Sequence, residues 1–95
     1  MSLALVIHDL PAGSTAAKVM FDAIYEIAPA HWAVTEGAVL AETEVSPTYL
    51  RDHLRRALQV KGEPACLLLV SRIGTNAVWS NLGSDGEAWL RDTLG

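Results

Sequence analysis

The chain of 95 residues has few of the side chains that stabilise small folds through disulfides or bound metal ions. It has one cysteine, Cys66, and three histidines. A single cysteine cannot form a disulfide within the chain, and its place in an apolar run predicts a buried thiol in a reducing compartment. One cysteine and three scattered histidines also do not make a zinc-site spacing. We therefore expect a cytoplasmic protein without a disulfide framework or a structural zinc ion.

Long hydrophobic runs and positive charge are also scarce. The apolar run from Ala65 to Val70 is far shorter than the ~20 residues that a bilayer-spanning helix needs, so we expect no membrane segment. Seven Lys and Arg against eleven Asp and Glu give a formal net charge of −4. This argues against nucleic-acid binding driven by bulk positive charge. The length predicts one domain, residues 1–95.

Apolar runs and turn signals predict four strands. Residues 3–7 and 65–70 are short, fully apolar and bounded by turn residues, which is typical of strands at the centre of a sheet. Residues 31–34 and 38–41 flank a short connection that contains Gly37, which is typical of an antiparallel hairpin.

Helix signals stand between and after these strands. Ser14 or Thr15 is suited to cap one helix, and Ser46 with Pro47 begins a second. Ser84 and Glu87 have the spacing of a capping box and predict a third helix. The order of elements predicts an α+β, ferredoxin-like βαββαβ fold, with an antiparallel four-stranded sheet, two helices on one face and an extra C-terminal helix.

Short pieces spread along the chain form a recognisable pattern. An apolar strand ends in an Asp-Leu pair, tryptophan stands in the second strand, and the second helix contains Leu-Arg-Asp-x-Leu. An apolar fourth strand, a Trp-Ser pair and a Trp-Leu helix follow. The pieces are Ile7-His8-Asp9-Leu10, Trp32, Leu50-Arg51-Asp52-His53-Leu54, Leu67-Leu68-Leu69-Val70, Val78-Trp79-Ser80 and Trp89-Leu90.

This pattern resembles the SinR-like family, small bacterial and phage proteins placed near the second CRISPR adaptation protein and the VapD ribonucleases. The chain has His8 where that family has tyrosine, and Val39 where tryptophan is common. The resemblance implies a homodimer in which Asp9, at the end of the first strand, lies near its symmetry mate. It further implies a nuclease superfamily.

Asp9 is the strongest candidate for chemistry. A carboxylate at the mouth of a buried strand can hold Mg²⁺ or Mn²⁺, and such an ion can polarise a phosphodiester or activate water. An aspartate followed by x-Pro is also a common turn starter, and this alternative stays open. His8 is a candidate general base or metal ligand. Adjacent strand residues point to opposite faces, so His8 and Asp9 cooperate only if the strand has already ended.

Three arginines are candidate nucleic-acid contacts. Arg51, Arg55 and Arg56 make residues 51–61 locally basic within an acidic chain, and helical spacing puts Arg51 and Arg55 side by side. A solvated helix face has the same pattern, and Arg51 is also placed to pair with a nearby acid.

Three functions remain open from the sequence. The first is a homodimeric, metal-dependent endonuclease on RNA or DNA, in a defence or mobile-element setting, as the resemblance implies. The second is a catalytically silent dimeric binding or adaptor module of the same fold. The third is a small-ligand sensor, which would need an apolar pocket. Whether the chain is an enzyme depends on which of these holds.

Overall fold

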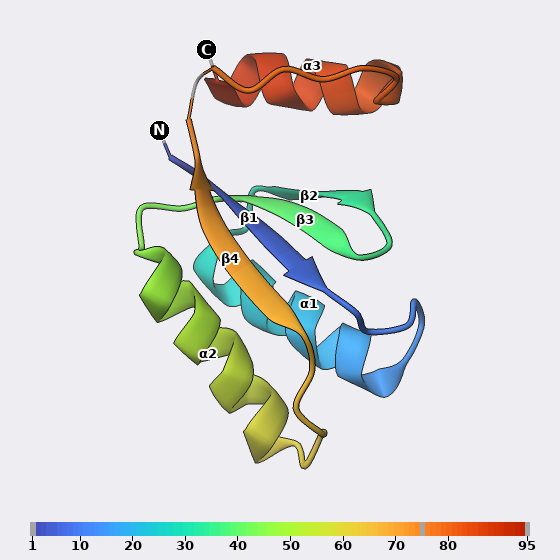
Figure 1. The fold of residues 1–95 in the computed structure, drawn as a ribbon, viewed down its shortest axis with the longest axis vertical. Coiled ribbons are helices and arrows are strands. Elements are labelled where there is room, and N and C mark those ends of the chain that lie inside the picture. Colours follow the sequence, from blue (N-terminus) through green and yellow to red (C-terminus); the bar gives the residue numbers. More distant parts are fainter. Residues whose placement is uncertain (1, 75, 95) are drawn as a thin grey trace.

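The computed structural model describes residues 2–74 and 76–94. Four strands form one antiparallel sheet in the spatial order β2-β3-β1-β4 (Figure 1). This confirms the predicted α+β class and agrees with a ferredoxin-like fold that has an added C-terminal helix. The elements are β1 (Leu3–His8), α1 (Thr15–Ile27), β2 (His31–Thr35), β3 (Ala38–Glu42), α2 (Pro47–Val60), β4 (Leu68–Ile73) and α3 (Gly83–Leu94).

Helices α1 and α2 begin at serines, as the sequence predicts. Ser14 Oγ accepts a hydrogen bond from the amide of Ala17 at 3.1 Å, and Ser46 Oγ accepts one from Tyr49 at 3.0 Å. Each serine satisfies an amide of the first turn that has no partner within the helix. Pro47 at the start of α2 costs no hydrogen bond at that position.

The main core lies between the sheet and the pair α1 and α2, which cover one face of it (Figure 1). Alternate residues of β1, Ala4 and Val6, belong to this buried cluster. Met20 and Ile24 of α1 and Leu54 of α2 belong to it as well. Every second residue of β1 thus faces α1 and α2, and the apolar residues of these helices recur at helical spacing on the side that faces the sheet.

Helix α3 packs on the opposite face of the sheet. The other alternate residues of β1, Leu3 and Leu5, lie in a second cluster with Leu40 of β3 and Leu90 of α3. The predicted closing helix is therefore confirmed. The second cluster also contains all three tryptophans of the chain, Trp32, Trp79 and Trp89.

Strand β4 differs from the prediction in both position and neighbours. It spans Leu68–Ile73 rather than 65–70, and it lies at the sheet edge, paired with β1. The expectation that the apolar run 65–70 occupies the sheet centre is therefore wrong. The ladder ends at the His8–Leu68 pair, because the amide of the residue before Leu68 bonds to a side chain instead of continuing it.

The start of α3 also differs. The helix begins at Gly83, one residue before the predicted cap Ser84. The Glu87 carboxylate accepts a hydrogen bond from Trp79 Nε1 at 3.2 Å and lies 3.9 Å from Arg91 Nη2. Glu87 therefore binds Trp79 of the second cluster and lies near Arg91, and it does not form the predicted reciprocal cap with Ser84.

The helices are short. The longest, α2, has 14 residues, whereas a membrane-spanning helix needs ~20. Within residues 2–74 and 76–94, no helix combines the length and apolar character needed to cross a membrane.

Candidate functional site

His8, the last residue of β1, is turned into the protein. Its side chain is buried, and its ring meets Phe21 of α1 edge-on, with ring centroids 6.1 Å apart. Nδ1 accepts a hydrogen bond from the amide of Leu10 at 3.1 Å. The neutral ring therefore carries its proton on Nε2. Nε2 is buried and has no hydrogen-bond partner among the described residues.

This environment favours the neutral imidazole. Burial lowers the pKa of His8 below its ordinary value, and the carboxylates of Asp9 and Glu36 oppose that shift. A buried ring disfavours its own charged form because water no longer solvates it. His8 is thus a neutral, packed side chain whose Nδ1 lone pair is already used.

Asp9 takes a different direction from His8. It is exposed, and its Oδ1 accepts a hydrogen bond from the amide of Leu67 at 3.1 Å. Because His8 pairs with Leu68, Asp9 stands one step beyond the ladder, opposite Leu67. The carboxylate closes the end of the β1–β4 pair. The structure therefore does not bring the His8 ring and the Asp9 carboxylate together in one site.

The fit of a divalent cation to Asp9 can be judged from its surroundings. Mg²⁺ and Mn²⁺ prefer several oxygen ligands, and one oxygen of Asp9 is engaged by Leu67. Within residues 2–74 and 76–94, no group of three or more His, Cys, Asp or Glu side chains is arranged to hold a metal ion. One chain alone therefore does not fit the ion, and a shared site would need Asp9 of a second copy.

The three arginines of α2 border neighbouring hollows around the helix, and Arg55 and Arg56 share one of these hollows with Asp52 and Gln59. Arg51 and Arg55 border a groove between α2 and the chain that leads into β4. Arg56 borders a hollow of about 300 Å³ between α1 and α2. Arg51 donates to Asp52 Oδ1 from Nε at 3.1 Å and from Nη2 at 2.9 Å, which confirms that it pairs with a nearby acid.

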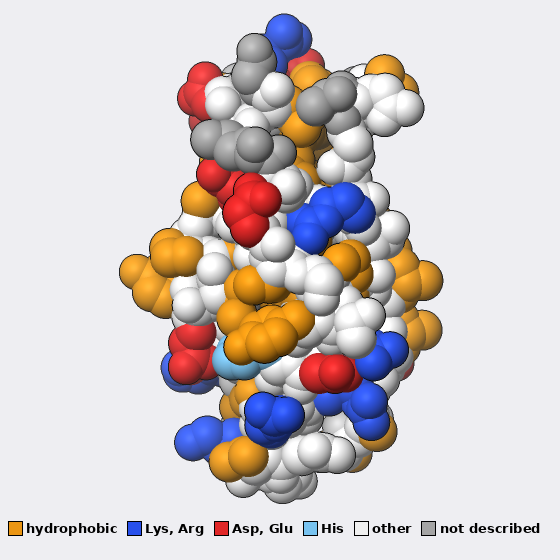
Figure 2. All heavy atoms as spheres, turned by 90° about the vertical axis from the view of Figure 1, so that its left-hand side faces the viewer, with side chains coloured by type: hydrophobic (Ala, Val, Ile, Leu, Met, Phe, Trp, Pro, Cys, Tyr) orange, Lys and Arg blue, Asp and Glu red, His pale blue; other side chains and the backbone are white. Residues whose placement is uncertain are grey.

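Figure 2 shows the side of the molecule that carries α2. Basic side chains gather in the lower half of this view, with acidic and hydrophobic side chains between them. The local basic character expected for residues 51–61 is thus present at the surface, but acids such as Asp52 partly neutralise it.

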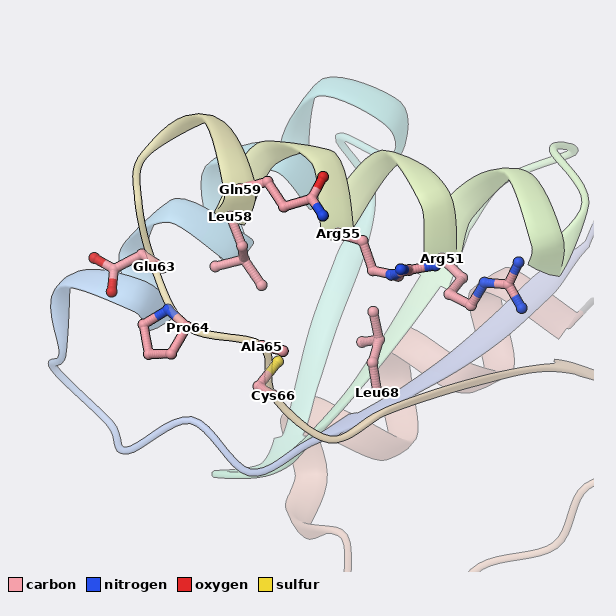
Figure 3. A pocket seen from close by; sticks show the side chains of 9 residues that line it. All are labelled: Arg51, Arg55, Leu58, Gln59, Glu63, Pro64, Ala65, Cys66 and Leu68. Carbon is pink, nitrogen blue, oxygen red and sulfur yellow. The ribbon is translucent and has the colours of Figure 1, made fainter.

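The groove beside Arg51 and Arg55, the α2–β4 groove, was not predicted from the sequence (Figure 3). It has a volume of about 410 Å³. One wall follows helical spacing along α2, a signal present in the sequence. The opposite wall comes from the chain before β4, and only the fold brings the two together. The lining residues are Arg51, Arg55, Leu58, Gln59, Glu63, Pro64, Ala65, Cys66 and Leu68.

The sheet face opposite α1 and α2 is only partly covered by α3. Leu67 and Leu69 remain 53% and 52% exposed. Ile7, which pairs with Leu69, is half-buried and belongs to neither buried cluster. Leu5, the next β1 residue on this face, already packs against the second cluster with Leu90 of α3. Three residues, Ile7, Leu67 and Leu69, are called the open sheet face below.

The chain was compared with protein-family models, curated proteins and solved structures. No protein-family model, curated protein or solved structure matches the chain.

Proposed function

We propose that the chain is a homodimeric binding module without catalytic activity of its own, and that two copies meet through the open sheet face. The observation that carries this proposal is the exposure of Leu67 and Leu69 beside Ile7. Contiguous exposed apolar side chains commonly mark protein–protein contacts. β4 also lies at the sheet edge, where backbone groups are available to a partner strand.

The arrangement of His8 and Asp9 supports the silent form of this module. A general base must reach the proton that it removes, and the His8 ring is buried against Phe21 with Nδ1 already accepting from Leu10. The Asp9 carboxylate holds the amide of Leu67. The contacts of both side chains therefore stabilise the fold, and these contacts explain their positions without a catalytic role.

Nucleic acid is the partner that we propose for the dimer. Arg51, Arg55 and Arg56 present guanidinium groups on α2, and such groups bind phosphates. Replacing all three with glutamine should weaken binding of labelled RNA or DNA and flatten its dependence on salt, because fewer counterions are released. Unchanged affinity and salt dependence in the triple variant would contradict the contact. The defence or mobile-element setting is part of this proposal, since it follows from the resemblance alone.

A metal-dependent endonuclease is the second candidate. It is favoured by one observation, the exposure of Asp9 at the end of β1, opposite Leu67 of the open sheet face. A dimer formed through that face offers a way to bring Asp9 of both copies toward one ion. Mg²⁺ or Mn²⁺ would then supply Lewis-acid activation of a phosphodiester.

Oligomeric state tests the main proposal. Light scattering should give the wild type twice the chain mass of 10.2 kDa. The double variant Leu67→Glu, Leu69→Glu should weaken self-association at least about a hundredfold, because two apolar contacts of about 1.5–3 kcal/mol each are lost. Val60→Glu is the matched control, since Val60 is 76% exposed on α2 and away from the open sheet face. A monomeric wild type, or a double variant that stays dimeric, would contradict the proposed interface.

Cleavage assays separate the two candidates. Labelled RNA, single-stranded DNA and duplex DNA are incubated with Mg²⁺ or Mn²⁺ and with wild type, Asp9→Ala or Asp9→Asn. Asparagine keeps an acceptor for the Leu67 amide, whereas alanine removes it at a cost of about 1 kcal/mol. If the chain is a silent module, neither the wild type nor either Asp9 variant should cleave any of these substrates. Cleavage by the wild type that both variants lose, with the folding of Asp9→Asn intact, would establish the nuclease instead.

A further inference from the structure

The α2–β4 groove has an apolar half. Leu58 of α2 and Leu68 of β4 extend into it from opposite walls, and Ala65 and Cys66 form its floor (Figure 3). Pro64 closes one side. The volume of about 410 Å³ lies within the range of about 300–1,000 Å³ that small-molecule sites occupy.

The other half of the groove carries a positive charge, on Arg55, that is only weakly paired. Arg51 is occupied by Asp52, but Arg55 Nη1 comes no closer than 4.0 Å to that carboxylate. Among the described residues, no hydrogen bond is donated by the Arg55 guanidinium. Figure 3 shows the Arg55 side chain lying along the groove toward Arg51, while Glu63 stands at the opposite end. The groove therefore has a basic end and an acidic end.

We propose that this groove binds a small amphiphilic anion, a molecule with an apolar body and one terminal carboxylate or phosphate group. The apolar body lies between Leu58 and Leu68, and the anionic group bonds to the guanidinium of Arg55. The fork of an arginine matches a carboxylate or phosphate through two parallel hydrogen bonds. This site lies outside the proposed dimer contact, because its lining contains none of the three residues of the open sheet face. It shares Arg51 and Arg55 with the proposed nucleic-acid contact, but its occupant is a small molecule and not a nucleic acid.

The lining also speaks against a nucleobase as the occupant. Nucleobases in single strands are usually held by stacking on aromatic side chains. None of the nine described lining residues is aromatic, and the apolar part is aliphatic apart from the Cys66 thiol. An aliphatic body with a charged end fits this composition better than a base with its phosphate.

Cys66 provides a reporter at the floor of the groove. It is the only cysteine of the chain and is partly exposed, so the prediction of a buried thiol is wrong. Its reaction with a thiol reagent therefore reports occupancy of the groove directly. Burial raises the pKa of this thiol, and the nearby charge of Asp9 adds to the shift. The reaction is therefore followed at alkaline pH, the same for every probe, because a larger fraction of the thiol is ionised there.

The test uses octanoate, hexyl phosphate and 1-octanol as probes on the full chain. Octanoate and hexyl phosphate should slow the modification of Cys66, and each should bind about tenfold more tightly than 1-octanol, as measured by calorimetry. Their two affinities tell whether the carboxylate or the phosphate is the preferred group. Arg55→Gln should lose about tenfold in affinity for both anions.

Arg56→Gln is the matched control, because Arg56 is the residue that follows Arg55 in α2 and does not line the groove. It should bind octanoate as the wild type does. Equal affinities for octanoate and 1-octanol, or equal losses in Arg55→Gln and Arg56→Gln, would overturn the anionic end of the site. Failure of all three probes to protect Cys66 would overturn the site itself, whatever the oligomeric state of the protein.

Discussion

Replacing Gly86 with alanine is expected to destabilise the protein, although alanine is the better helix former. Gly86 is buried in α3, and a Cβ atom there would lie 2.3 Å from Cη2 and 2.4 Å from Cζ2 of Trp32. The indole has little room to turn away, because it packs in the second cluster with its ring centroid 6.4 Å from that of Trp89. Overpacking costs about 1–3 kcal/mol and the helix propensity of alanine returns about 1 kcal/mol, so we expect a net loss of up to about 2 kcal/mol.

Tryptophan emission during chemical denaturation measures this effect. All three tryptophans lie in the second cluster, so their emission reports how α3 sits on the sheet. Gly86→Ala should lower the denaturation midpoint and shift the emission of the folded state to longer wavelength. Ala88→Gly, at an exposed position of α3, should lose about 1 kcal/mol of helix propensity while the folded-state emission stays unchanged. A higher midpoint with unchanged emission in Gly86→Ala would show that Trp32 makes room without cost.

The sequence was sufficient to predict α1 and α2. Their starts depend on local chemistry, because Ser14 and Ser46 satisfy amides that are near them in the chain. Their buried faces follow helical spacing, which places Ile24 and Leu54 in the main core. Features of this kind need no knowledge of distant residues, and the prediction succeeded for that reason.

The position of β4 could not be obtained in the same way. Its bounds are set by the length of β1 and by Asp9, whose side chain takes the amide of Leu67 and ends the ladder. The strand then continues through Ser71 and Arg72, because a strand at the sheet edge tolerates polar side chains. The apolar run predicted a central strand, but Leu67 and Leu69 are exposed. The same mismatch between an apolar run and an edge position supports a partner on the open sheet face.

The candidate site was predicted only in part. Alternation along β1 correctly warned that His8 and Asp9 point to different sides. Which hollow each arginine of α2 borders depends on the rotation of α2 against α1 and the sheet, which helical spacing alone does not fix. The α2–β4 groove depends on the path of residues 63–66 after the helix, a segment without regular structure and hence without periodicity to read.

His8 makes the stability of the protein depend on pH in a defined direction. The folded state has the lowered pKa, because the ring is buried, while the unfolded chain titrates near its ordinary value of ~6.5. Below that value the unfolded state binds more protons than the folded state, so the free energy of unfolding falls as the pH falls. Above it, both states hold a neutral ring and the contribution is complete. The loss continues down to the pKa of the folded state.

His8→Asn should remove this dependence while keeping an acceptor for the amide of Leu10. We expect the free energy of unfolding of the wild type to fall between about pH 7.5 and 5 more steeply than that of the variant. Glu36→Gln removes a carboxylate that raises the pKa of His8. In an NMR titration, the His8 imidazole of this variant should therefore titrate at lower pH than that of the wild type. The Ala12 amide, which donates to Glu36 at 3.2 Å, keeps an acceptor in that variant. Equal slopes in wild type and His8→Asn would mean that the ring is protonated as easily in the folded chain as in the unfolded one, and that the buried, neutral His8 described above is wrong.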